Sequence, residues 1–326
     1  MIEALSLTKR YGQLTAVDAL SFSVESGLVT GFLGPNGAGK STTMRMILGL
    51  DRPTSGTVTI GGRTYGELDS PLRTVGALLD ARWVHPNRSA RNHLAVIAAL
   101  AGLPEVRVDE VLERVGLSAV ANKRAGTFSL GMSQRLGIAG ALLGDPQVLM
   151  FDEPVNGLDP EGIVWIRTLM QDLAREGRTV LVSSHLLSEM AVTATHLIVI
   201  GRGALIADCS TQEFLDRAVA AGVVLRTPDS ARVLPALRAA GLGVQNDGSD
   251  SLLITGEGIT TDRVGHLAPG VGAIISELSL RRASLEEAFM ELTADSVEYS
   301  ANSTAARATP AGCTPDHVLA LTAAGK

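Results

Sequence analysis

The chain has 326 residues, 45% of them hydrophobic and 19% charged, which is enough to bury a substantial core in two domains plus extensions. Its net charge of −6, scattered Lys and Arg residues and 3% aromatic content argue against a nucleic-acid binder. The two cysteines, Cys209 and Cys313, lie far apart, which favours free thiols in a reducing compartment over a disulfide or a zinc site.

The first distinctive segment is glycine-rich and lies between an expected strand, residues 28–33, and an expected helix, residues 43–48. It reads Gly34-Pro35-Asn36-Gly37-Ala38-Gly39-Lys40-Ser41-Thr42. The glycines let successive N–H groups point at a β-phosphate, Lys40 reaches the β- and γ-oxygens, and the Ser41 hydroxyl ligates Mg²⁺. A glycine-rich turn is common in a chain with 35 Gly, but Lys is rare here, so the full pattern predicts a site for ATP and Mg²⁺.

The next segments predict a mixture of strands and helices up to about residue 208, typical of an α/β domain with parallel crossovers. Residues 55–62 suggest a small hairpin. Apolar periodicity predicts helices over residues 94–102, 108–115 and 134–143.

A continuous apolar run then ends in two acids, as expected for a strand over residues 148–153 that is buried on both faces and opens onto a site. In that reading, Asp152 holds Mg²⁺ through water and Glu153 orients the attacking water. Taken alone, a strand ending in Asp-Glu-Pro fits a helix or turn cap equally well. Beside the phosphate-binding segment, the catalytic reading is favoured.

The pattern changes near Gly222. Strands are predicted over residues 223–226, 242–245, 252–255 and 271–278, with helices over 231–240 and 260–267. This βαββαβ order indicates a small α+β, ferredoxin-like module. A last amphipathic helix over residues 284–292 is expected to close the unit, with Ser284 as its N-cap. Residues 295–326 are rich in Ala, Thr and Ser and are expected to form a disordered tail.

One further segment identifies the family. Phe128-Ser129-Leu130-Gly131-Met132-Ser133-Gln134-Arg135 precedes the Asp152 strand, where ATP-binding subunits of ABC transporters carry their signature loop. Residues 156–160, Asn-Gly-Leu-Asp-Pro, resemble the D-loop of that family, and residues 183–185, Ser-Ser-His, resemble its switch histidine. The resemblance covers residues 2–215. Residues 76–80, 129–132 and 284–292 also resemble bacterial antibiotic-resistance exporters of the daunorubicin- and bacitracin-resistance kind.

The resemblance implies a P-loop NTPase fold of ABC type over residues 1–215, a mixed sheet with a helical signature subdomain at about residues 85–145. An accessory or regulatory domain is expected to follow over residues 216–294. It also implies roles for single residues. Tyr11 stacks on adenine, His185 contacts the γ-phosphate, and Asp159 communicates across a dimer. The signature residues Ser129, Leu130, Gly131 and Met132 complete the ATP site of a second chain, because one phosphate loop covers the nucleotide from one side only.

The sequence departs from the family pattern at three positions. Leu130 and Met132 replace a glycine and a glutamine of the signature, which predicts slower or more demanding closure of the dimer. Asp80 stands at the Q-loop position, where the family has a glutamine that senses Mg²⁺ and contacts the membrane partner. A carboxylate there is expected either to add negative charge near the metal site or to lie in a solvated loop.

These observations predict an ATPase that forms an ATP-dependent homodimer, or a heterodimer with a paralogue, and drives a separate transmembrane permease. The expected cargo is a drug, an antibiotic or another amphipathic compound. No apolar run reaches the roughly 18 residues of a membrane span and the N-terminus does not resemble a signal peptide, so we expect a cytoplasmic chain held at the inner face of the membrane by its permease. Two alternatives stay open: a non-transport ATPase acting on ribosomes or DNA, and a regulatory module without hydrolysis.

Overall fold

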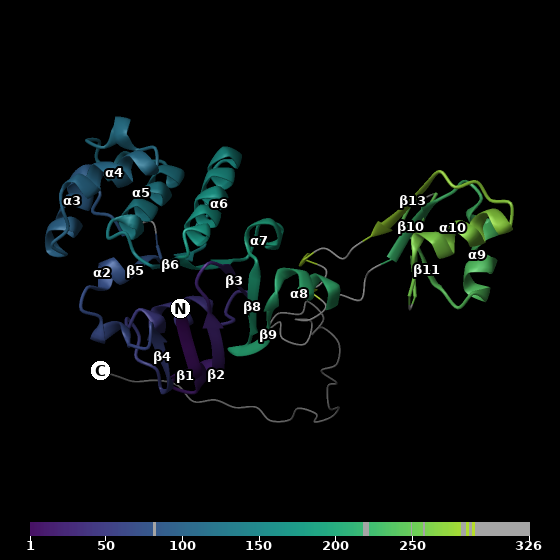
Figure 1. Cartoon of the computed structure of the whole chain (residues 1–326), viewed down its shortest axis with the longest axis horizontal. Coiled ribbons are helices and arrows are strands. Elements are labelled where there is room, and N and C mark those ends of the chain that lie inside the picture. Colours follow the sequence, from purple (N-terminus) through teal and green to yellow (C-terminus); the bar gives the residue numbers. More distant parts are fainter. Residues whose placement is uncertain are drawn as a thin grey trace, which may run out of the picture.

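The computed structural model describes residues 1–80, 83–217, 222–248, 250–256, 258–281, 285–286 and 289–290. We call residues 1–217 the N-terminal domain and residues 222–281 the C-terminal module (Figure 1). The expected tail, Cys313 and the expected cap Ser284 lie outside the described residues.

A six-stranded mixed sheet is the centre of the N-terminal domain. Its first five strands are parallel and its last strand is antiparallel. In spatial order the strands are β5 (Val75–Leu78), β6 (Val148–Asp152), β7 (Thr179–Ser184), β3 (Val29–Leu33), β8 (His196–Gly201) and β9 (Ala204–Ser210). The mixed α/β architecture expected from the sequence is confirmed.

Both faces of this sheet are buried. Along β6, Val148 and Met150 belong to one hydrophobic cluster, whereas Leu149 and Phe151 belong to the other. Successive side chains of a strand point to opposite faces, so a strand covered on both sides needs an uninterrupted apolar run. This explains why residues 148–151 are all apolar and why the first polar residue, Asp152, stands at the strand's carboxyl end.

A second sheet of three antiparallel strands, β1 (Ile2–Tyr11), β2 (Leu14–Val24) and β4 (Ser55–Ile60), covers one face of the first, with α1 (Lys40–Ile47) packed between them. Phe22 and Phe32 join the two sheets, with 5.6 Å between ring centroids. The small hairpin expected at residues 55–62 was wrong, because β4 pairs along β1 and only a single bridge links Ile60 to Arg63. That long-range pairing buries Val58 and Ile60.

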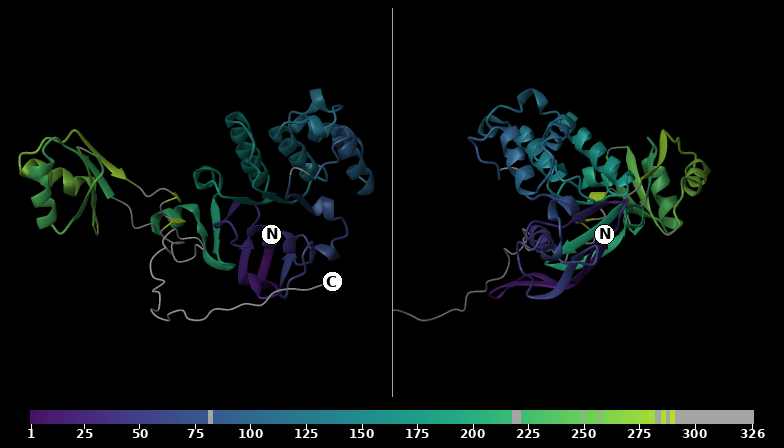
Figure 2. Two further views of the ribbon diagram at one scale, coloured as in Figure 1. Left: turned by 180° about the vertical axis from the view of Figure 1, so that it is seen from behind. Right: turned by 60° about the vertical axis from the view of Figure 1, so that its left-hand side comes forward.

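Helices cover the other face of the six-stranded sheet (Figures 1 and 2). They are α3 (Ala90–Leu100), α4 (Val106–Arg114), α5 (Leu130–Leu142), α6 (Pro160–Arg175), α7 (Leu187–Thr193) and α8 (Thr211–Arg217). The short helix α2 (Pro71–Thr74) directly precedes the edge strand β5 and has no buried residue. The helices α3, α5 and α6 begin after Ser89, Ser129 and Asp159, whose side chains accept a hydrogen bond from a backbone N–H in the first turn. The three helices expected within residues 85–145 are present, but α3 and α5 begin four residues earlier than apolar periodicity indicated.

The C-terminal module contains one antiparallel sheet in the order β11-β12-β10-β13, with two helices packed on it. Its elements are β10 (Gly222–Arg226), α9 (Ser230–Ala239), β11 (Gly243–Asn246), β12 (Ser251–Thr255), α10 (Thr261–Gly270) and β13 (Glu277–Arg281). Their order along the chain is the βαββαβ order that the sequence predicted. The last strand lies six residues later than expected, because it follows the register of β10, in which Arg226 pairs with Glu277.

Beyond this module, Leu285 and Phe289 are 1% and 8% exposed and belong to the hydrophobic cluster of the N-terminal domain, together with Phe214 of α8. Figures 1 and 2 show this short segment beside α8. We expected these residues to close the C-terminal unit, but the module's own cluster does not include them. The sequence could not show which of two apolar surfaces this segment would cover.

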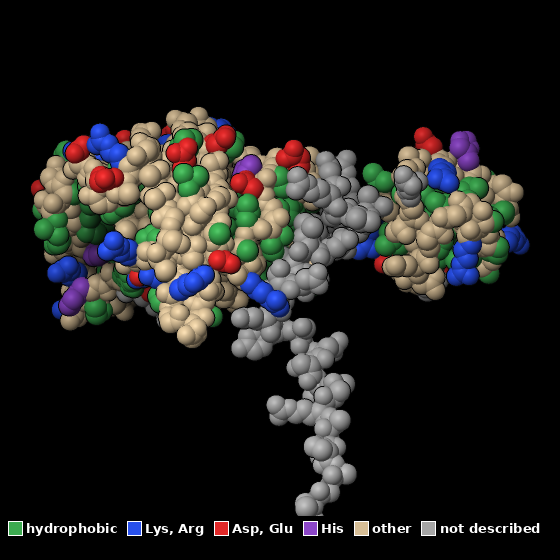
Figure 3. Space-filling model, turned by 90° about the horizontal axis from the view of Figure 1, so that it is seen from below, with side chains coloured by type: hydrophobic (Ala, Val, Ile, Leu, Met, Phe, Trp, Pro, Cys, Tyr) green, Lys and Arg blue, Asp and Glu red, His purple; other side chains and the backbone are tan. Residues whose placement is uncertain are grey.

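Two surface properties bear on function. None of the helices formed by the described residues is long and apolar enough to cross a bilayer. On the face shown in Figure 3, Lys and Arg side chains are dispersed among acidic ones. A nucleic-acid binder typically has a continuous basic stripe, and this face has none.

Candidate functional site

The glycine-rich segment forms a loop between β3 and α1, as the sequence predicted. Gly39 has a φ of 102°, and a Cβ atom there would collide with the backbone carbonyl of Ala16. Only glycine fits this position. The loop borders a cleft of about 340 Å³, lined by Ala16, Asn36, Gly37, Ala38, Gly39, Lys40, Ser41, Thr42, Leu79, Asp152 and Glu153. The loop and the two predicted acids therefore open onto one cleft.

Lys40 lies inside this loop and is 8% exposed. Its ammonium donates hydrogen bonds to the carbonyls of Gly34, at 2.6 Å, and Pro35, at 3.1 Å. Burial lowers the pKa of Lys40, while the nearby carboxylates of Glu153 and Asp152 oppose this effect. A buried cation with only carbonyl partners is well suited to bind an anionic ligand in the cleft.

Asp152 lies at the end of β6, next to the first turn of α1. Its Oδ2 accepts a hydrogen bond from the Ser41 hydroxyl at 2.9 Å, and its Oδ1 accepts one from Ser183 of β7. A hydroxyl and a carboxylate this close, beside a phosphate site, are a donor set that suits Mg²⁺, which takes few protein ligands and keeps water and phosphate oxygens. Ser41 and Asp152 thus fit the predicted metal role, whereas Ser183 orients the carboxylate.

Glu153, which lines the cleft, forms a pair with His185. The Nδ1 of His185 lies 2.7 Å from the Oε2 of Glu153, and the imidazole is half exposed. Glu153 has a φ of 50°, in the left-handed region that non-glycine residues rarely adopt. The structure thus brings together the two residues predicted to act on the attacking water, although they are 32 residues apart in the chain.

Tyr11, the predicted adenine-stacking residue, ends β1 and is 47% exposed. Its hydroxyl donates a hydrogen bond to the carboxylate of Asp51 at 3.2 Å, and the ammonium of Lys9 lies 5.0 Å from the centre of its ring. Arg45 of α1 holds the same carboxylate at 2.7 Å. The ring is therefore fixed through its hydroxyl and stays accessible to a planar ligand.

The signature residues lie at the N-terminus of α5. The Ser129 hydroxyl accepts a hydrogen bond from the N–H of Met132 at 3.2 Å, and both Ser129 and Leu130 are exposed. None of the four residues from Ser129 to Met132 lines the phosphate cleft of this chain. An exposed helix N-terminus presents N–H donors to an anion, so these residues are free to face a ligand held by another molecule.

The D-loop residues pack against the signature. Gly157 has a φ of 76°, and a Cβ atom there would overlap the side chain of Leu130. Asp159, predicted to communicate across a dimer, is the N-cap of α6 and accepts a hydrogen bond from the N–H of Gly162 at 2.8 Å. Within its own chain, Asp159 therefore stabilises the start of α6.

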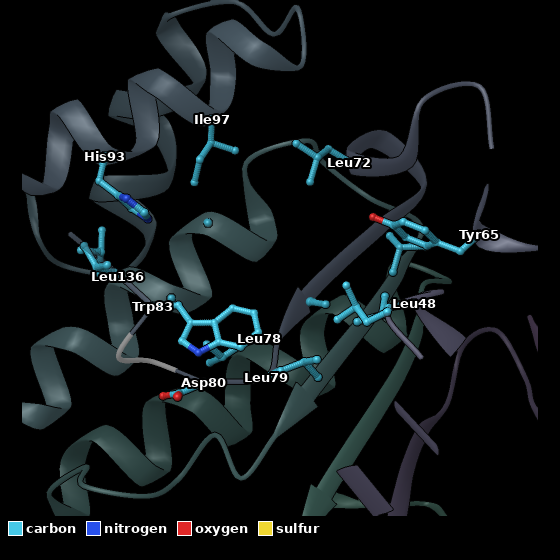
Figure 4. A pocket seen from close by; sticks show the side chains of 16 residues that line it. Leu48, Tyr65, Leu72, Leu78, Leu79, Asp80, Trp83, His93, Ile97 and Leu136 are labelled. Atoms are coloured by element: carbon cyan, nitrogen blue, oxygen red, sulfur yellow. The ribbon is translucent and has the colours of Figure 1, made fainter. Parts of the chain in front are cut away.

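Asp80 lies beside a different cavity, an apolar groove of about 280 Å³ between β5 and the helical subdomain. Trp83, Leu78 and Asp80 all line this groove, and in Figure 4 His93 and Ile97 point into it from α3. Trp83 is 65% exposed. Leu79, not Asp80, is the neighbour that lines the phosphate cleft.

Three residues at these sites were not singled out in the sequence. Ser183 orients Asp152, Asp51 holds Tyr11, and Gln134 of α5 donates a hydrogen bond to the backbone carbonyl of Glu153 at 3.2 Å. Ser183 and Gln134 lie within segments already quoted, so their position in a motif was a usable signal. Asp51 follows a helix in a polar turn, and nothing in its local sequence sets it apart.

Comparisons with known proteins agree with this geometry. The family model described as "ABC transporter" matches residues 17–156. A second family model, described only as a domain of unknown function, matches residues 221–286. The phosphate loop, signature and Asp152 strand all lie within the first match.

Relatives and solved structures extend the match. The chain is 45% identical over 209 residues to the bacitracin transport ATP-binding protein BcrA of Bacillus licheniformis, covering 63% of this chain and 68% of that protein. It is 37% identical over 206 residues to the lantibiotic transport ATP-binding protein SrtF of Streptococcus pyogenes, covering 63% and 89%. A solved dimeric bacterial ABC transporter cassette is similar with a TM-score of 0.60 at 25% identity, covering 65% and 99%.

Proposed function

The chain belongs to the family of ABC transporter ATP-binding subunits, and on that basis we propose how it acts: two copies close over two ATP molecules and drive a separate membrane permease that exports an antibiotic or another amphipathic compound. The protein is an ATPase of this family. The observation that carries the mechanism is the Glu153–His185 pair, because Glu153 lines the same cleft as the phosphate loop, Ser41 and Asp152.

Within one chain, the cleft has the groups needed to bind the triphosphate. Lys40 would exchange its carbonyl partners for β- and γ-phosphate oxygens, and the loop N–H groups would bind the β-phosphate. Ser41 and Asp152 would hold Mg²⁺, which when bound offsets phosphate charge. Tyr11 would stack on the adenine ring.

Hydrolysis needs a water in line with the γ-phosphate. The Glu153 carboxylate would orient that water and accept its proton, while His185, bonded to the same carboxylate, would hold it in place and contact the γ-phosphate. Positioning and charge stabilisation supply most of the catalysis in such a reaction, so small displacements of Glu153 should reduce turnover strongly.

The second copy completes the site. In this proposal, Ser129 and the N–H of Gly131 in the partner bind the γ-phosphate from the open side of the cleft. Closure would then depend on ATP and reverse after hydrolysis, converting phosphate chemistry into a rigid-body movement. The exposure of Ser129 and Leu130, and the absence of residues 129–132 from the lining of their own chain's cleft, support this arrangement.

The permease would dock in the apolar groove shown in Figure 4, where Trp83 is exposed beside Asp80. An exposed aromatic at the edge of an apolar groove is a common anchor of a protein interface. This docking would hold the chain at the inner face of the membrane. The cargo class rests on the relatives, whose names specify bacitracin and lantibiotic transport.

Members of the family that act on ribosomes or DNA usually have two nucleotide-binding domains in one chain or a long coiled-coil insertion. Among the described residues the longest helix is α6, with 16 residues, and the two relatives named above are transport ATP-binding proteins. This alternative is not favoured.

Size-exclusion chromatography with ATP and Mg²⁺ tests the proposal on three variants. Glu153→Gln should bind ATP, lose most turnover and accumulate as a dimer, because the nucleotide cradle is intact and the base is absent. Lys40→Ala should stay monomeric because it binds ATP weakly. Glu25→Gln, an exposed control on the same domain, should behave as the wild type. A Glu153→Gln protein that stays monomeric where the wild type associates would argue against closure over ATP.

A further inference from the structure

The backbone of Glu153 is held on both of its polar groups. Its N–H donates to the carbonyl and the hydroxyl of Ser183, at 3.1 and 3.2 Å. Its carbonyl accepts from the N–H of Asn156, at 3.2 Å, and from the side-chain amide of Gln134, also at 3.2 Å. Both lone pairs of the carbonyl are thus used, so the peptide after Glu153 has little freedom to rotate.

These contacts hold a strained conformation. A non-glycine residue at a φ of 50° costs on the order of 1 kcal/mol and persists only where its surroundings fix it. The direction of the Glu153 side chain depends on that conformation. Asn156 and Ser183 belong to the same turn and to the neighbouring strand, whereas Gln134 reaches the turn from the helical subdomain.

Gln134 lies on α5, the helix that begins with the signature. It is 4% exposed, and the next residue, Arg135, fixes the helix by donating to the carbonyl of Val115 at 3.0 Å and by stacking on Trp165, with 4.3 Å to the ring centre. The first turn of α5 and the carbonyl of Glu153 are therefore joined by one rigid helix and one hydrogen bond.

We propose that Gln134 is a positioning residue: its amide holds the backbone of Glu153 in its own chain, so that hydrolysis at one ATP depends on the position of the helix whose first turn binds the other ATP. This inference rests on the proposed function, in which Ser129 acts on the partner's nucleotide and Glu153 on its own. If α5 shifts when the signature binds the partner's ATP, the hydrogen bond from Gln134 would change and the orientation of Glu153 in the same chain would change with it.

The first experiment compares Gln134→Met, which keeps the side-chain length and removes the N–H donor, with Gln171→Met. Gln171 is the matched control, because its amide also donates to a backbone carbonyl, that of Val192 at 3.0 Å, away from the cleft. For Gln134→Met we expect kcat to fall about tenfold, as for loss of one hydrogen bond that positions the base, with KM for ATP within about twofold of the wild type.

The Gln171→Met control should keep the wild-type kcat. Unfolding temperatures of both variants separate positioning from general destabilisation. If Gln134→Met does not fold, Gln134→Leu, whose side chain also has no donor, should show the same selective loss of kcat. The proposal would be overturned if a folded Gln134→Met protein kept kcat within about twofold of the wild type. It would also be overturned if Gln171→Met reduced kcat as much as Gln134→Met does.

The second experiment uses mixed dimers to determine which site Gln134 serves. With Glu153→Gln and Gln134→Met on the same chain, the other chain keeps its own base and its own Gln134, so activity should match that of the reference dimer of Glu153→Gln with wild type. With the substitutions on opposite chains, the remaining base lacks its Gln134 and activity should fall about tenfold below the reference.

The reverse ranking would show that Gln134 acts through the signature on the partner's ATP and would overturn the inference. Failure of Glu153→Gln to dimerise at all would instead count against the proposed function, and the kcat comparison in the single variants would still decide the role of Gln134. The two failures are therefore distinguishable.

Discussion

The hydroxyl of Tyr11 lies 3.2 Å from the carboxylate of Asp51, and that carboxylate is held in turn by the guanidinium of Arg45, with 2.7 Å between Nε and Oδ2. The hydrogen bond from Arg45 keeps the pKa of Asp51 below its usual range, so the acceptor of the Tyr11 hydroxyl stays ionised. A ring that would stack on adenine is thereby attached to the helix that follows the phosphate loop.

Removing that attachment should weaken ATP binding without affecting the chemistry. We expect Asp51→Ala to raise KM about fivefold, equivalent to ~1 kcal/mol, with kcat unchanged. In a Tyr11→Phe background, Asp51→Ala should add little, because the hydroxyl it serves is already absent. Steady-state kinetics of the single and double variants measure this coupling.

The matched control is Asp69→Ala. Asp69 pairs with Arg63 at 2.9 Å over the same separation of six residues, but on an exposed surface, so its loss should leave KM unchanged. Fully additive effects of Tyr11→Phe and Asp51→Ala would show that the two side chains act independently.

The contact between Leu130 and Gly157 predicts a second result. Gly157→Ala places a Cβ at a φ of 76° and against the Leu130 side chain, so it should destabilise the protein by about 1–3 kcal/mol beyond the conformational cost alone. Gly177→Ala supplies that reference, because Gly177 has a φ of 86° and no atom near its Cβ position.

Thermal unfolding measures the difference between these two variants. Leu130→Gly should restore most of the stability and ATPase activity lost in Gly157→Ala, since it removes the overlap and recreates the family's signature residue. Equal destabilisation by Gly157→Ala and Gly177→Ala would contradict the idea that Leu130 is packed on the D-loop.

His93 gives the helical subdomain a predicted pH dependence. Burial, together with the nearby Arg88, lowers the pKa of His93 below its ordinary 6.5, and its Nδ1 is a buried atom without a hydrogen-bond partner. The unfolded chain therefore binds a proton more readily than the folded one. The contribution of neutral His93 to the free energy of unfolding is fully present above pH 6.5 and is lost as the pH falls through the lowered pKa.

Chemical denaturation at about pH 7.5 and pH 5.5 compares the wild type with His93→Gln. The variant should lose less stability on acidification than the wild type. The same change at the exposed His266 should leave the wild-type pH dependence intact. An identical acid loss in His93→Gln and wild type would assign the pH dependence to other groups.

The position of Asp80 predicts whether its carboxylate acts on the metal site or on the apolar groove. The sequence placed its charge near the metal site or in a solvated loop, and the structure places it, exposed, at the apolar groove. An exposed charge there is worth about 1 kcal/mol or less to the metal site, so Asp80→Gln should leave the half-saturating Mg²⁺ concentration within about twofold. Stimulation of the ATPase by the permease should change.

Titrations of Mg²⁺ at fixed ATP and ionic strength, with and without the permease, check both expectations. Trp83→Ala in the same groove should affect stimulation and not the Mg²⁺ titration. A marked shift of the Mg²⁺ midpoint in Asp80→Gln alone would show that its carboxylate acts on the metal site after all.

Most of the features that could be predicted from the sequence depend on local chemistry. The phosphate loop requires its glycines, and the strand before Asp152 requires apolar residues on two faces, so both are visible in the sequence. Strand pairings and packing contacts between distant segments could not be predicted from the sequence. Ser55–Ile60 pairs with β1, fifty residues away, and Leu285 packs beside Phe214, because apolar area is buried wherever a matching surface exists. Helix starts were placed late because the capping side chains, not the apolar periodicity, determine them.

The site was predictable as a set of residues but not as a geometry. Lys40, Ser41, Asp152, Glu153 and His185 follow from their motifs. Ser183 and Gln134 lie in quoted motifs, but the contacts by which they hold Asp152 and Glu153 follow from no spacing rule. The same is true of the contact between Asp51 and Tyr11. Such supporting contacts become visible only when the elements are packed together.

The burial of Leu285 and Phe289 beside Phe214 makes the C-terminal module an insertion with two anchors rather than a terminal appendage. The N-terminal domain therefore draws core side chains from both sides of the module in the chain, Phe214 before it and Leu285 and Phe289 after it. A truncation at residue 217 would remove two core side chains along with it and expose the apolar surface that they cover.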